Sequence, residues 1–209
     1  ASGRTIPVIG PSDGQVFDAL QRSNAEDIDQ AVHAARQCFD MGWSKVSAVE
    51  RGRLLMRLSQ KVAEHADELA VIEQRDCGKP TKQAKADAAA LARYFEFYAG
   101  ACDKLHGETI PYQDGYSVFT WREPHGVTGH IVPWNYPMQI FGRSVGAALA
   151  AGNTCVVKPS EDACLSLLYL AQLATEVGFP AGALNLVTGY GHEVGDALAR
   201  HPGIDHISF

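Results

Sequence analysis

Two short clusters of polar residues follow apolar runs, and both have side chains that could do chemistry. The run 127–132 is followed by PWNYP, and the run 154–157 is followed by KPSE. The side-chain amide of Asn135 can donate a hydrogen bond to an oxygen that becomes negative during a reaction. Lys158 and Glu161 supply a charged donor and a carboxylate acceptor. These side chains are therefore the candidate site residues of the sequence.

The elements that must position these clusters alternate along the chain. The two apolar runs are short and rich in β-type residues, and a small-residue helical segment joins them, which indicates a βαβ unit and a parallel sheet. Ligands bind at the carboxyl ends of the strands in such sheets, where both clusters lie. An α/β fold with helices on both faces is predicted. The strands are expected at 127–132, 154–158, 184–188 and 205–209, and the helices at 138–151, 163–177 and 192–200.

Helices are also expected upstream, where Ser23 with Glu26 and Ser47 with Glu50 match capping boxes. A third helix is expected at 67–77 with Gly78 as its stop, and a fourth at 82–101. Before the first helix, residues 1–22 are expected to be irregular or to form short strands, and residues 116–121 have a β-type pattern.

Four motifs in this order resemble the aldehyde dehydrogenase superfamily. They are WNYP, KPSE, FPAGALNLVTGYGHEVG at 179–195 and HISF at 206–209. The resemblance implies a Rossmann-like open parallel sheet at 126–209, an N-terminal helical part at 1–114 and a β-strand oligomerisation arm at 115–125. Members of the family continue well beyond residue 209, so the chain is expected to be truncated relative to the full fold.

The resemblance implies NAD-dependent oxidation of an aldehyde to a carboxylic acid through a cysteine thiohemiacetal. The nucleophilic cysteine and the general base would lie outside this chain, and Asn135 would bind the oxygen of the thiohemiacetal. Glu161 would accept hydrogen bonds from the adenosine ribose, and its charge would disfavour the 2′-phosphate of NADP. Taken alone, Asn135 could be a turn residue, and Lys158 with Glu161 could be a surface pair that opens a helix. The implied NAD-binding residues are Val132, Pro133, Trp134, Lys158, Ser160, Glu161, Gly191 and Gly195.

The glycine-rich stretch at 189–195 departs from the usual dinucleotide fingerprint. Its spacing is GxGxxxG, which is one residue longer than GxGxxG, and it follows the third strand of the alternating unit instead of the first. By itself this motif is weak evidence for dinucleotide binding, and the alternative is a glycine-rich turn between a strand and a helix. The aldehyde dehydrogenase family shows the same variant.

Arg143 is a cation on a helix whose other residues are mostly apolar or small. Tyr136, Ile140 and Arg143 fall on one helical face, and the resemblance implies that this face lines the substrate tunnel. An arginine at this place resembles members that oxidise carboxylate-bearing semialdehydes, since guanidinium binds carboxylates in a bidentate manner. The alternative is an ion pair with a loop or a neighbouring subunit.

Composition narrows the remaining classes. A net charge of −6 and the lack of a basic run argue against nucleic-acid binding. No apolar run is long enough for a membrane span, and no signal peptide is recognisable. The five cysteines lack CxxC spacing, which suits a reducing compartment. The cytoplasm is therefore the expected location. The histidines have no metal-ligand spacing, and no metal is expected. A homodimer or homotetramer is expected from the resemblance. Two alternatives stay open: a non-catalytic fragment for nucleotide binding or subunit interaction, and a related reductase.

Overall fold

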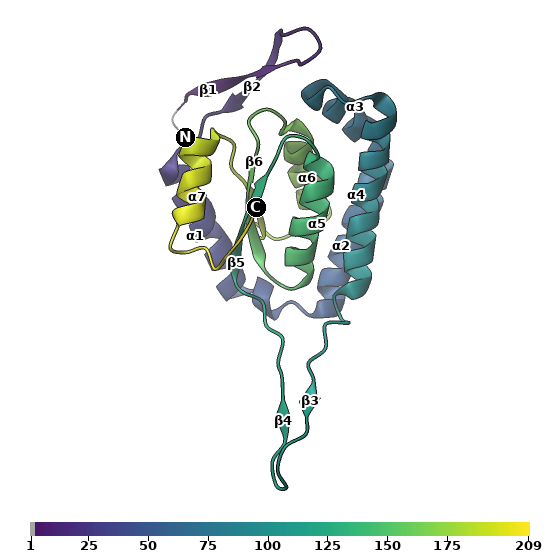
Figure 1. Cartoon of the computed structure of the whole chain (residues 1–209), viewed down its shortest axis with the longest axis vertical. Helices are drawn as coiled ribbons and strands as arrows, with labels where there is room; N and C mark the ends of the chain where they lie inside the picture. The colour runs from purple at the N-terminus through teal and green to yellow at the C-terminus, as the bar shows by residue number, and fades with distance from the viewer. Residues whose placement is uncertain (1–2) are drawn as a thin grey trace.

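The computed structural model describes residues 3–209, and its centre is a four-stranded parallel sheet. The strand order is β7 (Leu184–Leu186), β6 (Thr154–Pro159), β5 (Val127–Val132) and β8 (His206–Ser208), as Figure 1 shows in part. Val127 lies opposite Thr154, and Val132 lies opposite Pro159, so β5 and β6 end at the same edge. The predicted open parallel sheet is confirmed.

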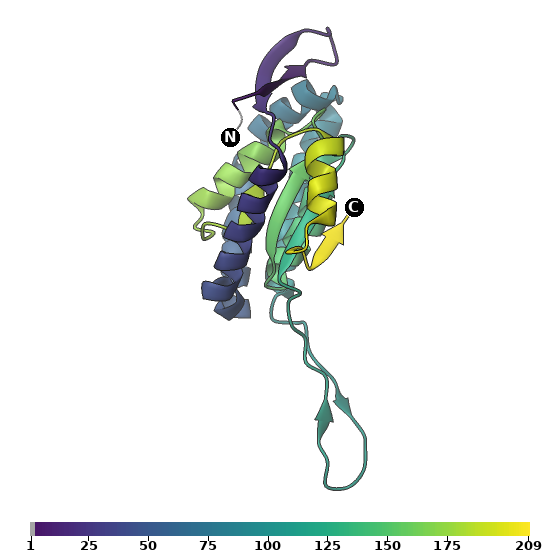
Figure 2. The same ribbon diagram turned by 90° about the vertical axis from the view of Figure 1, so that its left-hand side faces the viewer.

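Helices cover both faces of this sheet (Figures 1 and 2). The first helix α1 and the last helix α7 pack on one face, and α5 and α6 pack on the other, with α2 and α4 outside them. Short helical turns η1 and η2 precede α2 and α7. The bounds are α1 (Ala25–Met41), η1 (Trp43–Lys45), α2 (Ala48–Glu64), α3 (Ala66–Cys77), α4 (Thr81–Ala101), α5 (Pro137–Ala150), α6 (Leu165–Glu176), η2 (Gly191–Gly195) and α7 (Asp196–Arg200).

The alternation of side chains along β6 divides the core into two clusters. Cys155 and Val157 face the larger cluster, which contains the apolar sides of α2, α4, α5 and α6. Val156 points to the other face and packs among residues of α1 and α7. Every residue of β6 is buried, as expected for a central parallel strand that is covered on both faces.

Two of the three predicted helix signals are confirmed and one is displaced by a residue. The Ser47 hydroxyl accepts from the backbone of Glu50 at 3.2 Å, and Gly78 ends α3 with φ +72°. The first capping box was predicted at Ser23 and is instead formed by Asn24 with Asp27. The reason is that the backbone N–H of Ser23 bonds to a carbonyl in the loop after β7, 3.1 Å away, which keeps Ser23 outside the helix.

Two antiparallel hairpins extend from opposite ends of this body (Figure 2). One pairs β1 (Thr5–Ile9) with β2 (Val16–Gln21), so the first segment does contain short strands. The other pairs β3 (Thr109–Ile110) with β4 (Val118–Phe119) at the tip of a long arm. The expected arm at 115–125 is therefore too short, because its first strand precedes residue 115 and was assigned to the helical part.

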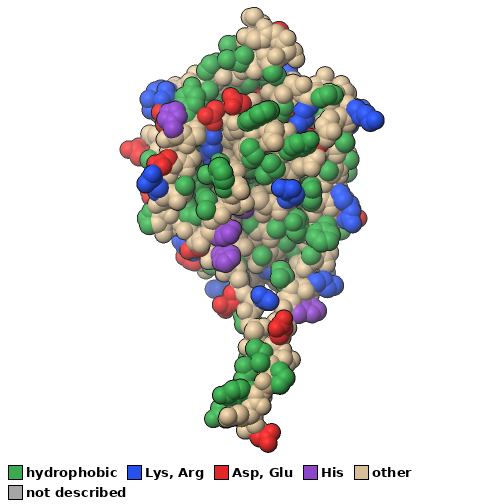
Figure 3. All heavy atoms as spheres, viewed as in Figure 1, with side chains coloured by type: hydrophobic (Ala, Val, Ile, Leu, Met, Phe, Trp, Pro, Cys, Tyr) green, Lys and Arg blue, Asp and Glu red, His purple; other side chains and the backbone are tan. Residues whose placement is uncertain are grey.

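Hydrophobic side chains lie exposed along this arm, as Figure 3 shows. Trp121 is 75% exposed, and the other large exposed side chains there are Ile110, Tyr112, Tyr116 and Phe119. Within the described residues, no helix has the length and apolar character needed to cross a membrane.

Candidate functional site

The two polar clusters lie side by side at the carboxyl ends of the neighbouring strands β5 and β6, as predicted. The backbone N–H of Ser160 donates to the carbonyl of Val132 at 2.8 Å, which ties the end of β6 to the end of β5. Both predicted binding segments therefore leave the sheet side by side. Val132 is buried, Ser160 is partly exposed, and Pro133 is exposed at the surface of this edge.

Lys158, Glu161 and the loop after β7 form a contiguous charged cluster. The Lys158 ammonium lies 2.5 Å from one carboxylate oxygen of Glu161, and the N–H of Gly191 donates to the other oxygen at 3.1 Å. Burial would raise the pKa of Glu161, but the hydrogen bonds from Lys158 and from the Gly191 backbone outweigh it and lower that pKa. Glu161 is therefore a carboxylate at neutral pH.

Lys158 is only 3% exposed, so the alternative of a surface lysine at a helix start is wrong. It belongs to the last part of β6, and α6 begins only at Leu165. A buried ammonium is costly without a partner, and Glu161 supplies one. The pair is thus built into the edge of the sheet and is not a solvated helix terminus.

The two glycines predicted to contact a nucleotide differ in their exposure. A Cβ atom placed on Gly191 would lie 3.9 Å from both Lys158 Nζ and Glu161 Oε1, and one on Gly195 would meet nothing within 4 Å. These residues bound η2, whose π-helical turn absorbs the extra residue of the GxGxxxG spacing. The backbone at Gly191 is exposed and open to a ligand that lies against the charged cluster, whereas Gly195 is buried.

Asn135 lies exposed in the turn between β5 and α5. Its neighbours Trp134 and Tyr136 are also open, with 58% and 41% of their surface exposed. The proline at the first position of α5 favours the start of a helix directly after this turn. The amide of Asn135 is therefore available to a bound molecule at the carboxyl edge of the sheet.

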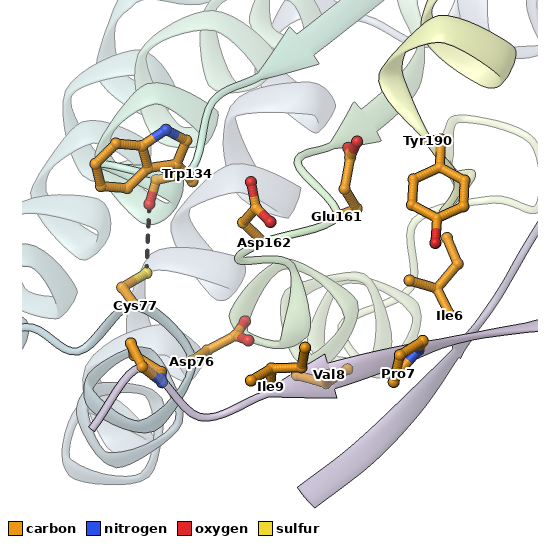
Figure 4. A pocket seen from close by; sticks show the side chains of 11 residues that line it. Ile6, Pro7, Val8, Ile9, Asp76, Cys77, Trp134, Glu161, Asp162 and Tyr190 are labelled. Atoms are coloured by element: carbon orange, nitrogen blue, oxygen red, sulfur yellow. Dashed lines mark hydrogen bonds between the residues drawn. The ribbon is translucent and has the colours of Figure 1, made fainter. Parts of the chain in front are cut away.

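A cavity of about 390 Å³ lies between this edge and the β1–β2 hairpin (Figure 4). Trp134 and Glu161, two of the residues predicted to bind NAD, line it, but most of its wall comes from residues that the sequence did not single out. Asp76 and Cys77 enter from the end of α3, and the Cys77 thiol donates to the Trp134 carbonyl at 3.4 Å. The other missed residues that line it are Ile6, Pro7, Val8, Ile9, Pro11, Asp162 and Tyr190.

Asp76 is an unusual carboxyl in this wall, because it is only 3% exposed. One of its oxygens accepts from the backbone of Leu165 at 2.8 Å, while the other has no hydrogen-bond partner among residues 3–209. Burial raises the pKa of Asp76 to about 6, despite the backbone hydrogen bonds that oppose this change. Nothing in the local sequence signals it, since the contact with α6 joins distant segments.

The three predicted substrate residues share one face of the helix that follows Asn135. Ile140 is partly buried against the core, whereas Tyr136 and Arg143 are exposed. Arg143 makes no ion pair with any residue from 3 to 209. Within the described chain, the alternative of an ion pair with a loop therefore finds no partner.

The five cysteines are all free thiols. Burial raises the pKa of each thiol, and for Cys77, the one beside the Asn135 turn, the pKa rises to about 12. A nucleophilic cysteine must be a thiolate. None of these five is in a setting that favours a thiolate. Residues 3–209 also include no cluster of three or more His, Cys, Asp or Glu side chains that could hold a metal ion.

A family model then decides the classification, because the model of the aldehyde dehydrogenase family matches residues 1–209. The chain belongs to the aldehyde dehydrogenase family. It is 46% identical to aldehyde dehydrogenase family 2 member B4, mitochondrial, of Arabidopsis thaliana, over 100% of this chain and 39% of that protein.

Solved structures agree with this aldehyde dehydrogenase assignment. One from Burkholderia cenocepacia, provisionally assigned as an aldehyde dehydrogenase, matches with a TM-score of 0.98 and 74% identity, over 99% of this chain and 43% of that one. PnpE, solved in complex with nicotinamide adenine dinucleotide, matches with a TM-score of 0.96 and 42% identity, over 99% of this chain and 42% of its own. The aldehyde dehydrogenase chain described here thus spans about two fifths of the length of its relatives.

Proposed function

We propose that the protein carrying this chain oxidises an aldehyde to a carboxylic acid with NAD as the hydride acceptor. The observation that carries the proposal is the juxtaposition at the sheet edge. An exposed asparagine follows β5, and the Lys158–Glu161 pair, bonded to Gly191, follows β6. The NAD complex of the relative PnpE supports the choice of cofactor.

The residues of this cluster fit a dinucleotide. Lys158 and Gly191 occupy one position on each oxygen of Glu161, and a carboxylate has about four acceptor sites, so Glu161 can still accept from ribose hydroxyls. The exposed backbone at Gly191 leaves room for a nucleotide beside this pair. NAD, when bound, supplies the nicotinamide ring that accepts hydride. The Val132–Trp134 segment would flank it on the neighbouring strand.

Asn135 would act on the aldehyde itself. When a cysteine thiolate from outside this chain adds to the carbonyl carbon, the carbonyl oxygen becomes negative, and the Asn135 amide donates a hydrogen bond to it. A preorganised donor stabilises that charge more than it stabilises the neutral aldehyde, and so lowers the barrier. The same contact serves again when the thioester formed after hydride loss is attacked by water.

The replacement Asn135→Ala in the complete enzyme tests this function. We expect kcat to fall by about 10²–10³, the usual cost of one oxyanion donor, with the dissociation constant for NAD nearly unchanged. Stopped-flow kinetics would show whether the chemical step limits turnover. If chemistry limits and kcat stays at the wild-type value, Asn135 has no such role. If the wild type oxidises no aldehyde from a broad panel, the whole function is refuted.

For the substrate class we propose a semialdehyde with a carboxylate at its far end. Support comes from Arg143, which lies on the same helical face as Tyr136, is exposed, and makes no ion pair within residues 3–209. A guanidinium that projects from this face offers a bidentate site for a carboxylate.

The test compares succinic semialdehyde with a neutral aldehyde of similar length, in wild type and in Arg143→Leu. We expect kcat/KM for the acidic substrate to fall by about 30-fold or more, the equivalent of at least roughly 2 kcal/mol, and the neutral aldehyde to change little. Arg93→Leu is the matched control, because Arg93 is an exposed arginine on α4. Equal losses on both substrates would assign Arg143 to the fold or to a subunit contact.

We further propose that the arm carrying β3 and β4 joins subunits into a homodimer or homotetramer. The support is its cluster of exposed aromatic side chains, which a monomer would leave in water. The check is the mass of the complete protein by light scattering, with Tyr116→Ser/Phe119→Ser expected to shift it toward smaller species. An unchanged mass would place the interface elsewhere.

A further inference from the structure

A buried charged cluster lies at the corner where α3 meets α4. The Lys79 ammonium is 2.7 Å from a carboxylate oxygen of Glu73 and 2.6 Å from one of Asp87. Both acidic side chains are 0% exposed and that of Lys79 is 10% exposed. The aldehyde dehydrogenase function proposed above uses none of these residues, and ion clusters this deep are costly unless every member is paired.

The cluster is well satisfied. The second oxygen of Glu73 accepts from the Ser166 hydroxyl at 2.8 Å. The second oxygen of Asp87 accepts from Gln83 at 2.7 Å and from Gln139 at 2.6 Å. Burial would lower the pKa of Lys79, but its hydrogen bonds to Asp87 and Glu73 outweigh this and raise the pKa. Lys79 is therefore a fixed cation whose rotamer is determined by two acidic partners.

Three contacts join this corner to the turn that contains Asn135. The Lys79 ammonium lies 4.6 Å from the centre of the Tyr136 ring, in a cation–π contact. The Cys77 thiol donates to the carbonyl of Trp134, and Gln139 in the first turn of α5 bonds to Asp87. The residues before and after Asn135 are thus both fastened to the α3–α4 corner, while Asn135 itself stays open.

We propose that Lys79 is a positioning residue for Asn135. Held by Glu73 and Asp87, it fixes the Tyr136 ring, and this sets the direction in which the neighbouring amide points. The inference rests on the proposed function, in which Asn135 stabilises an oxyanion. An oxyanion donor acts only when it is aimed in advance, and a misplacement of about 1 Å can cost roughly 100-fold in rate.

The principal test is Lys79→Met in the complete enzyme, made alone and together with Asn135→Ala. We expect Lys79→Met to lower kcat by about 10–100-fold and to leave KM for NAD within about twofold. Lys79→Arg should recover most of the rate, because arginine also pairs with acids and stacks on aromatic rings. Lys85→Met is the matched control, since Lys85 is an exposed lysine on α4, the helix that begins just after Lys79.

The double variant separates positioning from general damage. If Lys79 acts through Asn135, its removal should cost little more once Asn135 is alanine, so the two losses will not multiply. Full multiplication of the losses, or an unchanged kcat in Lys79→Met, would overturn the positioning role. If Asn135→Ala itself has no effect on a chemistry-limited kcat, the proposed function fails first, which is a different result.

Removal of Lys79 leaves two buried carboxylates without a counter-charge, and the resulting loss of stability can lower the activity of that variant by itself. The charge-balanced variant Glu73→Gln/Lys79→Met keeps the net charge of the cluster and the contact with Ser166. Its kcat, its KM for NAD and its coupling to Asn135→Ala are then read in the same way. A folded, charge-balanced variant with wild-type kcat would overturn the proposal.

Discussion

The buried histidine of β5 should make stability depend on pH in a narrow window. His130 is 2% exposed, and its Nε2 lies 2.9 Å from the Thr128 hydroxyl oxygen. That hydroxyl donates its own hydrogen to the Thr154 carbonyl at 3.0 Å, so Nε2 carries the proton and donates to it. The other ring nitrogen, Nδ1, has no partner among residues 3–209. Protonation would place a second hydrogen where no described residue accepts it.

The size of the pH effect on stability follows from the pKa of His130. Burial, with a smaller contribution from the nearby His206, lowers the pKa of His130 from 6.5 to about 4. Between these values the unfolded state binds a proton that the folded state does not, so stability falls as the pH drops through this window. Each pH unit corresponds to about 1.4 kcal/mol once the unfolded histidine is fully protonated. Unfolding should therefore be about 2 kcal/mol easier at pH 5 than at pH 7.5 on account of this one residue.

The assay is denaturant unfolding of the complete protein at both pH values, for wild type and for His130→Gln. Glutamine can keep a hydrogen bond to Thr128 and does not titrate, so the variant should lose about 2 kcal/mol less than wild type on acidification. His33→Gln removes an exposed histidine of α1 and should behave as wild type. If His130→Gln and wild type show the same pH dependence, the reasoning from burial is refuted.

Two further outcomes are expected. In the complete enzyme, Glu161→Gln should lower the ratio of kcat/KM with NAD to kcat/KM with NADP by roughly tenfold or more, because a hydrogen bond to a charged group contributes about 1.5–3 kcal/mol. The neighbouring variant Asp162→Asn should leave this ratio unchanged. If Glu161→Gln also leaves it unchanged, Glu161 is not the ribose partner. Gly52→Ala should destabilise the fold by about 1–3 kcal/mol, because its Cβ would lie 2.7 Å from the Ala99 carbonyl oxygen. Gly100→Ala should stabilise α4 by about 0.5–1 kcal/mol, because its Cβ would meet nothing within 4 Å. Thermal melts in which both variants shift the melting temperature in the same direction would contradict these two expectations.

Much of the sheet could be predicted because its signals are local. The β5 strand was predicted at its observed bounds, since a short apolar run that ends in a proline and an asparagine has few other structures available. The same logic placed Lys158 and Glu161 at the strand end. It could not show that Lys158 is buried, because burial depends on helices that pack from elsewhere in the chain.

Where the prediction failed, two local patterns competed or the deciding contact was distant. Ser23 with Glu26 and Asn24 with Asp27 both match a capping box, and only the bond between Ser23 and the loop after β7 selects the second. The corner at Lys79 was missed for a similar reason. A lysine that follows the glycine at the end of a helix is common and does not by itself indicate a buried ion pair. Its acidic partners come close to it only when α3 packs against α4.

The three tryptophans of the chain lie in three different environments, so their intrinsic fluorescence can report on three different parts of the structure. Trp43 is 1% exposed in the core, where its indole N–H donates to the Asn153 carbonyl at 2.8 Å. Trp134 flanks the candidate site, and Trp121 lies on the arm. Variants that keep one of these three indoles each would report separately on unfolding, on nucleotide binding by quenching, and on the proposed subunit contact by a blue shift. One optical instrument could then follow folding, ligand binding and assembly in a single sample series.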